Sequence, residues 1–330
     1  MRVTVMGAAG YVGSRLVPSL LAHGHEVNAT FTRPSSAHRF WWADRVHVTP
    51  LDVLDRASVR AAVPPGTDAV YYLVHGLAGD DFATRDRQGA YNAAHAAVRA
   101  RVGRLVYLGG LVPDLPEQEL SPHLRSRLEV EQVLTDSGVP TLGLRAAMVL
   151  GSGSTSFEVM RQVAERLPVH VVPSWLRSRV EPVAVTDVVA ALVGSLAAPP
   201  RSRAFDLGSG EVMSYVALLR LYARLAGLTR PQLVAPLVPT ALVARLAPLL
   251  TGAPASTVQT LVESLRHDMV CREHDFREVL LPEGHPVLGV AAAIDRALQA
   301  DEAGTADPQP DVLGPLPSDP AWTRDKGFRP

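Results

Sequence analysis

A short glycine-rich turn near the start of the chain constrains its fold more than any other feature. The segment GAAGYVG follows an apolar run at residues 3–6 that favours a strand, and it opens a helical pattern over residues 11–23. Glycines let such a turn approach a pyrophosphate, which binds the free N–H groups of the helix N-terminus. The alternative is an incidental tight turn. The predicted cofactor contacts in this turn are Gly7, Gly10, Tyr11, Val12 and Gly13.

Strand-like and helix-like segments then alternate along the first half of the sequence. Continuous apolar runs such as residues 69–74 are typical of strands buried in a parallel sheet. The alternation predicts an α/β fold, a Rossmann-type doubly wound parallel sheet with right-handed crossovers. Beyond residue 150 the rhythm breaks, and helix-rich apolar sequence predicts a smaller, mainly helical C-terminal cap that binds the substrate.

These changes define an expected domain organisation. Residues 1–150 form the NAD(P)-binding Rossmann domain, and residues 181–207 return to its sheet. Residues 151–180 and 208–300 form the substrate-binding cap. Residues 301–330 are rich in proline and polar side chains, which predicts a poorly ordered tail.

The composition narrows the possible partners. The chain has a formal net charge of -1 and a pI near 6.8, so electrostatics favour neither a nucleic acid nor a membrane as partner. The single cysteine, Cys271, cannot form an internal disulfide, and the N-terminus resembles no secretory signal, which predicts a cytoplasmic protein. No His/Cys/Asp cluster has metal-ligand spacing, so we expect no metal.

The end of the second predicted strand indicates which dinucleotide is bound. An acidic residue there would bind the adenosine ribose of NAD, whereas an arginine accommodates the 2′-phosphate of NADP. The sequence reads ATFTRPSS, so Arg33, assisted by Ser35, favours NADP(H), unless Arg33 is a solvated surface residue. Asp52 follows the third predicted strand. Its side chain either binds the adenine amino group or only stabilises a turn or caps a helix. The remaining predicted cofactor contacts are Val53, which follows Asp52, and Val74, His75 and Gly76, at the end of the strand predicted over residues 69–74.

Several of these motifs together resemble a known family, the extended and atypical short-chain dehydrogenase/reductases, nearest their NAD(P)H-binding, NmrA-like branch. GAAGYVG matches the G-x-x-G-x-x-G spacing of that group, and LVYLGGL is similar to the end of its fifth strand. PVAVTDVVAAL resembles its later helix. The resemblance covers about residues 1–300 and implies a cofactor-dependent oxidoreductase that is a monomer or a homodimer.

The resemblance also implies where catalysis takes place. The family's Y-x-x-x-K pattern falls on HLRSRLEVEQ, with His123 at the tyrosine and Arg127 at the lysine. Its serine falls among Gly109 and Gly110, and the only lysine of the chain, Lys326, lies in the tail. A histidine with an ordinary pKa can transfer a proton at neutral pH, and Arg127 could hold the ribose hydroxyls.

Other residues remain alternatives to this catalytic pair. The alternative for His123 is a residue at the start of its helix with only a structural or substrate-binding role. Tyr107 could donate a phenolic proton, although a tyrosine in an apolar strand is more often part of the core. The predicted substrate contacts are Gly109, Gly110, Arg145, Met148 and Trp175.

Three functions are compatible with these residues. The first is an NADPH-dependent reductase acting on a carbonyl or activated double bond of a small, largely apolar molecule. The second is a non-redox enzyme that retains bound NADP(H) and performs a rearrangement, elimination or cyclisation. The third is a regulatory protein that senses NADP(H).

Overall fold

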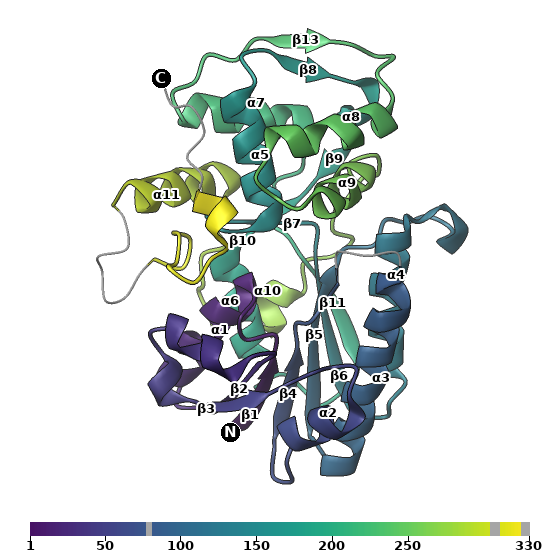
Figure 1. Ribbon diagram of the computed structural model, residues 1–330, viewed down its shortest axis with the longest axis vertical. Coiled ribbons are helices and arrows are strands. Elements are labelled where there is room, and N and C mark those ends of the chain that lie inside the picture. Colours follow the sequence, from purple (N-terminus) through teal and green to yellow (C-terminus); the bar gives the residue numbers. More distant parts are fainter. Residues whose placement is uncertain (77–80, 304–310, 325–330) are drawn as a thin grey trace.

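Seven parallel strands form the central sheet, in the order β11-β6-β5-β4-β1-β2-β3. The computed structural model describes residues 1–76, 81–303 and 311–324. The order reverses direction next to β1, as in a doubly wound sheet, so the predicted fold class is confirmed (Figure 1). The strands are β1 (Arg2–Met6), β2 (Glu26–Phe31), β3 (His47–Pro50), β4 (Ala69–Tyr72), β5 (Arg104–Gly110), β6 (Thr141–Ala146) and β11 (Arg203–Leu207).

Helices cover both faces of this sheet. Successive side chains of a strand point to opposite faces, so the apolar runs of β1, β4 and β5 supply two separate cores. One face carries α1 (Tyr11–Ala22) and α6 (Val185–Gly194), which pack against each other. The other face carries α2 (Arg56–Ala62), α3 (Phe82–Ala100) and α4 (Pro122–Thr135), as Figure 1 shows.

The cap lies beyond the carboxyl ends of the strands (Figure 1). Its apolar segments form α5 (Thr155–Arg166), α7 (Tyr215–Leu225), α8 (Thr240–Leu246) and α9 (Ala255–Ser264). Two further helices, α10 (Phe276–Val279) and α11 (Val290–Ala303), pack near the sheet and against α7 respectively. Three strand pairs complete this part: β7 (Met148–Leu150) with β10 (Pro182–Ala184), β8 (His170–Val172) with β13 (Gln232–Val234), and β9 (Arg179–Val180) with β12 (Met213–Ser214).

Short 3-10 helices connect these elements in the described part of the chain. They are η1 (Pro34–Arg39), η2 (Ala43–Arg45), η3 (Glu117–Glu119), η4 (Ser174–Arg177), η5 (Ala247–Leu250) and η6 (Ala321–Arg324). No helix within the described ranges combines the length and the apolar character that crossing a membrane requires. We propose that residues 1–150 with 181–207 form the dinucleotide-binding part and that residues 151–180 with 208–300 form the cap.

The prediction of a poorly ordered tail is wrong for residues 311–324. This segment, yellow in Figure 1, packs beside α11, and its Leu313 and Leu316 are buried. The prediction failed because proline-rich composition reports low helix and strand propensity, and says nothing about anchoring contacts elsewhere in the fold. Residues 304–310 and 325–330 of the predicted tail lie outside the described residues.

The anchor of this segment is a buried ion pair between Arg15 of α1 and Asp319. Both side chains are about 2% exposed, and the guanidinium donates two hydrogen bonds of 2.9 Å to the carboxylate. Its other N–H groups donate to the carbonyl oxygens of Val312, Ser152 and Gly314 at 2.8–2.9 Å. The arginine therefore joins the first helix, the loop after β7 and the C-terminal segment.

We expect Asp319→Ala to lower the free energy of unfolding by about 3–5 kcal/mol, because it leaves a buried guanidinium without its counter-charge. Chemical denaturation monitored by circular dichroism measures this loss. Asp311→Ala is the matched control, since Asp311 pairs with the more exposed Arg296 and should cost only about 0–1 kcal/mol. Equal losses for the two variants would contradict the role of Arg15 and Asp319.

Candidate active site

The glycine turn lies at the carboxyl edge of the sheet, between β1 and α1. Gly7 has a φ of +93°, and a Cβ there would lie 3.0 Å from the carbonyl carbon of Leu73. A Cβ on Gly13 would lie 2.9 Å from Ala8 Cα and would overlap the Gly7 carbonyl oxygen, so α1 can pack this closely only with glycine. Gly10 precedes α1, and no side chain caps that helix. The first N–H groups of α1 are therefore available to a pyrophosphate, which fits this cradle.

Tyr11 does not point its hydroxyl toward solvent. The hydroxyl is buried against Gly151, and it has no hydrogen-bond partner among the described residues. The Arg15 guanidinium lies over the ring at 4.0 Å, and burial raises the pKa of the phenol above its usual value. The Tyr11 side chain packs against the loop after β7, so the predicted cofactor contacts of Tyr11 and Val12 concern their backbone N–H groups.

The residues predicted to meet the adenosine half lie at the ends of β2 and β3. Arg33 and Ser35 are exposed just after β2, where a 2′-phosphate would lie. Asp52 Oδ1 accepts a hydrogen bond of 2.9 Å from Leu54 N, so Asp52 does stabilise its own turn. Val53 is half-buried against α3. The adenine contact of Asp52 and the other cofactor contacts remain predictions.

Arg127 of α4 is the centre of the candidate catalytic cluster. Its side chain is 5% exposed and interacts with the Tyr107 hydroxyl, and no carboxylate within residues 1–76, 81–303 and 311–324 forms an ion pair with its guanidinium. Its positive charge acts on His75, His123, Tyr107 and Tyr72. A buried cation without a counter-charge is costly, so this guanidinium is ready to bind a polar ligand.

His123 shares one face of α4 with Arg127, as the spacing predicted. Its pKa is not the ordinary value expected from the sequence. Burial, and secondly the charge of Arg127, lower the pKa of His123 to about 3. The imidazole is therefore neutral at pH 7, and it becomes a proton carrier only if negative charge develops beside it.

His75 and Gly76 follow β4 and face the same cluster. His75 is exposed, and the nearby positive charge of Arg127 is the main cause that lowers its pKa well below the usual range. Gly76 N donates a hydrogen bond of 2.8 Å to Asp86 of α3, and Ser126 Oγ lies 3.4 Å from the other carboxylate oxygen. Sequence analysis missed Asp86, a buried carboxylate on an alanine-rich helix, and burial raises its pKa. Val74, just before His75, is half-buried.

The two glycines at the end of β5 are not equivalent. A Cβ on Gly109 would lie 2.6 Å from the Tyr107 ring, so the serine of the resembled family does not fit there. A Cβ on Gly110 would lie 3.8 Å from Arg127 Cγ, which is ordinary contact. Tyr107 is itself 1% exposed, its hydroxyl lies 3.4 Å from the Arg127 carbonyl oxygen, and burial raises its pKa to about 12. Tyr107 therefore behaves as a core residue that supports Arg127.

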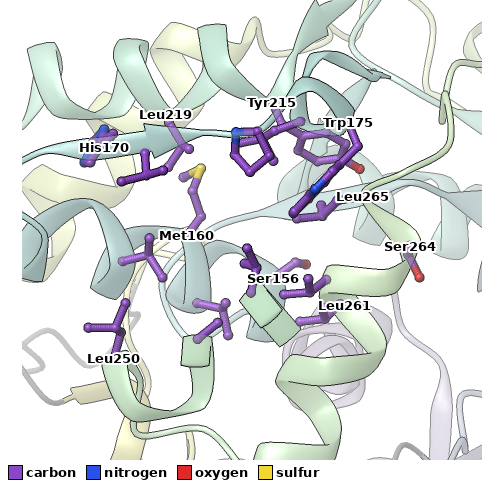
Figure 2. A pocket seen from close by; sticks show the side chains of 18 of the residues that line it. Ser156, Met160, His170, Trp175, Tyr215, Leu219, Leu250, Leu261, Ser264 and Leu265 are labelled. Carbon is purple, nitrogen blue, oxygen red and sulfur yellow. The ribbon is translucent and has the colours of Figure 1, made fainter. Parts of the chain in front are cut away.

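The predicted substrate residues divide into two groups. Arg145 of β6 donates hydrogen bonds of 2.9 and 2.5 Å to Glu131 of α4, so its guanidinium is already paired with a carboxylate that the sequence analysis missed. Met148 and Trp175 line one cavity of about 370 Å³ in the cap, shown in Figure 2. Ala147 is one of the residues that line the cavity, and the adjacent Ala146 pairs with Gly110 in the sheet. The candidate cluster and the cavity are thus neighbours along β5 and β6.

Comparison with known proteins agrees with this geometry. The profile of a family described as NAD(P)H-binding matches residues 7–186, which is more than half of the chain. The matched range includes every strand of the central sheet except β1 and β11. The chain belongs to the NAD(P)H-binding family. This match agrees with the NAD(P)H-binding branch that the sequence motifs resemble.

Individual relatives of this NAD(P)H-binding protein match only in part. An uncharacterized protein of Mycobacterium tuberculosis is 29% identical over 57% of this chain, which spans only 19% of that protein. A 3-diazoavenalumate denitrifying reductase of a Streptomyces species is 31% identical over 51% of this chain and 64% of its own length. The crystal structure of Citrobacter triphenylmethane reductase with NADP(H) has a TM-score of 0.70 at 16% identity, covering 90% of this chain and 100% of that chain.

The fold of this family member also gathers three side chains that could bind a metal. Glu181, Cys271 and His274 place one ligand atom each within 4.8 Å of one another. The Glu181 carboxylate, however, already accepts hydrogen bonds from His274 Nε2 at 2.5 Å, Gly210 N at 2.8 Å and Cys271 N at 3.0 Å. These donors explain a fully buried carboxylate without a metal, and the expectation of no metal remains a prediction.

The low pKa of His123 predicts a specific loss of stability in acid. Unfolded histidine titrates near 6.5, so below that pH the unfolded chain takes up a proton that the folded chain refuses. Stability should fall as the pH drops from about 6.5 toward 3. His123→Gln should therefore lose about 1 kcal/mol less than the wild type between pH 7 and pH 5, a figure reduced for partial exposure.

Urea denaturation at both pH values measures this difference. His95→Gln, which changes an exposed histidine of α3, is the matched control. Parallel profiles for the wild type and His123→Gln would show that His123 titrates normally.

Proposed function

We propose that this protein is an NADPH-dependent reductase acting on a carbonyl or activated double bond of a small, largely apolar molecule. The observation that carries the proposal is Arg127, a buried guanidinium without a counter-charge among the described residues, beside Gly110 at the end of β5. A cation in this position can bind both ribose hydroxyls and a carbonyl oxygen. The Streptomyces relative is by name a reductase, which supports the same class of enzyme.

The choice of NADP(H) rests on Arg33 and is supported by one structural relative. Arg33 is exposed at the end of β2, and no acidic residue lies between positions 27 and 43 to bind an unphosphorylated ribose. The Citrobacter enzyme with a similar fold was crystallised with NADP(H). NADPH would lie with its pyrophosphate on the Gly7–Gly13 turn and its nicotinamide ribose near Arg127.

Three residues of this chain, Arg127, His123 and Asp86, would then contribute to the reduction in different ways. When bound, NADPH supplies the hydride. Arg127 holds the ribose hydroxyls or the carbonyl oxygen and stabilises the negative charge that develops there. That negative charge raises the pKa of neighbouring His123, which takes up a proton from solvent and passes it to the oxygen. Asp86, through Gly76 N, positions the backbone after β4.

Arg33→Asp tests the cofactor. We expect it to weaken NADPH binding at least tenfold while changing NADH binding only a few-fold, because only NADPH carries the 2′-phosphate. Titration of cofactor fluorescence gives both dissociation constants. Arg99→Asp, an exposed arginine near the end of α3, is the control for the change in net charge. Equal losses for the two cofactors would exclude Arg33 from 2′-phosphate recognition.

Transfer of deuterium tests the reaction itself. NADPH deuterated at the reactive carbon is incubated with the protein and a broad metabolite extract, and products are read by mass spectrometry. We expect deuterium in one product and, with that substrate, a kcat about 100-fold lower for His123→Gln at similar NADPH affinity. His95→Gln should retain full activity.

Two other results would contradict parts of this proposal. Tight NADPH binding without any transfer would favour a non-redox enzyme or a sensor. Unchanged turnover of His123→Gln would remove His123 from the catalytic residues.

A further inference from the structure

The cap cavity has a lining that selects against charge. It is enclosed by residues of β8, η4, α5, α7, α8 and α9, and no Asp, Glu, Lys or Arg is among the described residues that line it. Burying an unpaired charge in such a cavity would be strongly unfavourable. A phosphate, a diphosphate or a carboxylate is therefore a poor occupant, and an uncharged apolar group is a good one.

Two polar side chains of the lining are already engaged. Trp175 Nε1 donates a hydrogen bond of 3.0 Å to the Val238 carbonyl oxygen, and Ser264 Oγ donates one of 3.0 Å to Thr260. These two residues and His170 lie around the cavity in Figure 2, with His170 and Trp175 at opposite ends of the view. His170 differs from the other two because one of its ring nitrogens has no partner.

His170 is 3% exposed, and its hydrogen bonding fixes its tautomer. Nε2 lies 3.2 Å from the Ala164 carbonyl oxygen, which can only accept, so Nε2 carries the hydrogen. Burial lowers the pKa of the ring, which keeps it neutral. Nδ1 is then an acceptor, and it is buried without a partner among the described residues. A buried acceptor of this kind lacks the donor that would offset its desolvation, and His170 is one of the residues that line the cavity.

The opening of the cavity is apolar as well. Val171, Leu242 and Leu246 line the cavity and are also 46–48% exposed, so they form its rim. Apolar residues at an opening favour a ligand whose apolar body extends past it.

We propose that the cap cavity binds an uncharged apolar molecule carrying a hydroxyl or N–H group that donates a hydrogen bond to His170 Nδ1. This inference rests on the proposed function insofar as the molecule is the substrate of the reductase. The donor group is a second polar group, distinct from the reacting one near Arg127. His170 is thus a specificity residue, because an analogue that lacks the donor leaves Nδ1 unpaired.

The test compares two probes that differ in one hydrogen-bond donor. 1-Decanol and decyl methyl ether have the same alkyl chain and an oxygen, but only the alcohol can donate. Each is titrated against the complex of the protein with the uncharged dye N-phenyl-1-naphthylamine, and displacement is read by fluorescence. We expect the alcohol to bind about fivefold more tightly than the ether. Equal affinities in the wild type, or no binding of the dye, would overturn the proposal.

The variant His170→Phe tests whether the preference for the alcohol over the ether depends on the His170 ring. It should bring the ratio of the two affinities close to one while the ether binds within about twofold of wild type. His95→Phe, far from the cavity on α3, should keep the fivefold ratio. A preference that survives in His170→Phe would overturn the role of His170, and the wild-type comparison decides the ligand class even if this variant does not fold.

NADPH binding, measured in the same samples, separates this inference from the proposed function. NADPH binding with equal affinities for alcohol and ether would defeat the cavity assignment alone. A clear preference for the alcohol in a protein that neither binds NADPH nor transfers hydride would defeat the reductase alone.

Discussion

The buried guanidinium of Arg15 is the interaction on which the arrangement of the parts depends. An arginine that is 2% exposed would be strongly destabilising without acceptors, and here they come from α1, the loop after β7 and residues 312–319. The same residue stacks on Tyr11, directly after the glycine turn. The Arg15 side chain therefore fixes the position of the glycine turn relative to the loop after β7, through which the chain enters the cap.

A second buried arginine has the opposite character. Arg127 has no carboxylate partner within the described part of the chain, and its charge contributes to lowering the pKa values of His75 and His123. The cluster is therefore poised to accept negative charge, whereas Arg15 is fully neutralised. This contrast between an arginine paired with a carboxylate and an arginine without a counter-charge among the described residues separates the structural arginine from the candidate functional one.

Much of the fold and part of the site could be predicted from the sequence. The glycine turn, the alternating strands and helices and the mainly helical cap follow from local patterns, and so does the shared face of His123 and Arg127. Asp86 and Glu131 were missed because an acidic residue on a helix carries no local sign of burial. The partner of Arg145 was hidden for the same reason, since only packing brings α4 against β6.

The sequence by itself determined the fold class and the glycine turn between β1 and α1, because glycine conformation and hydrophobic periodicity act over a few neighbouring residues. Only the tertiary structure decided that residues 311–324 are docked, that the pKa of His123 is about 3, and that His170 Nδ1 lacks a partner. Each of these depends on burial and on charges far away in the chain. Desolvation and Coulomb interactions act through space, so a linear pattern does not contain them.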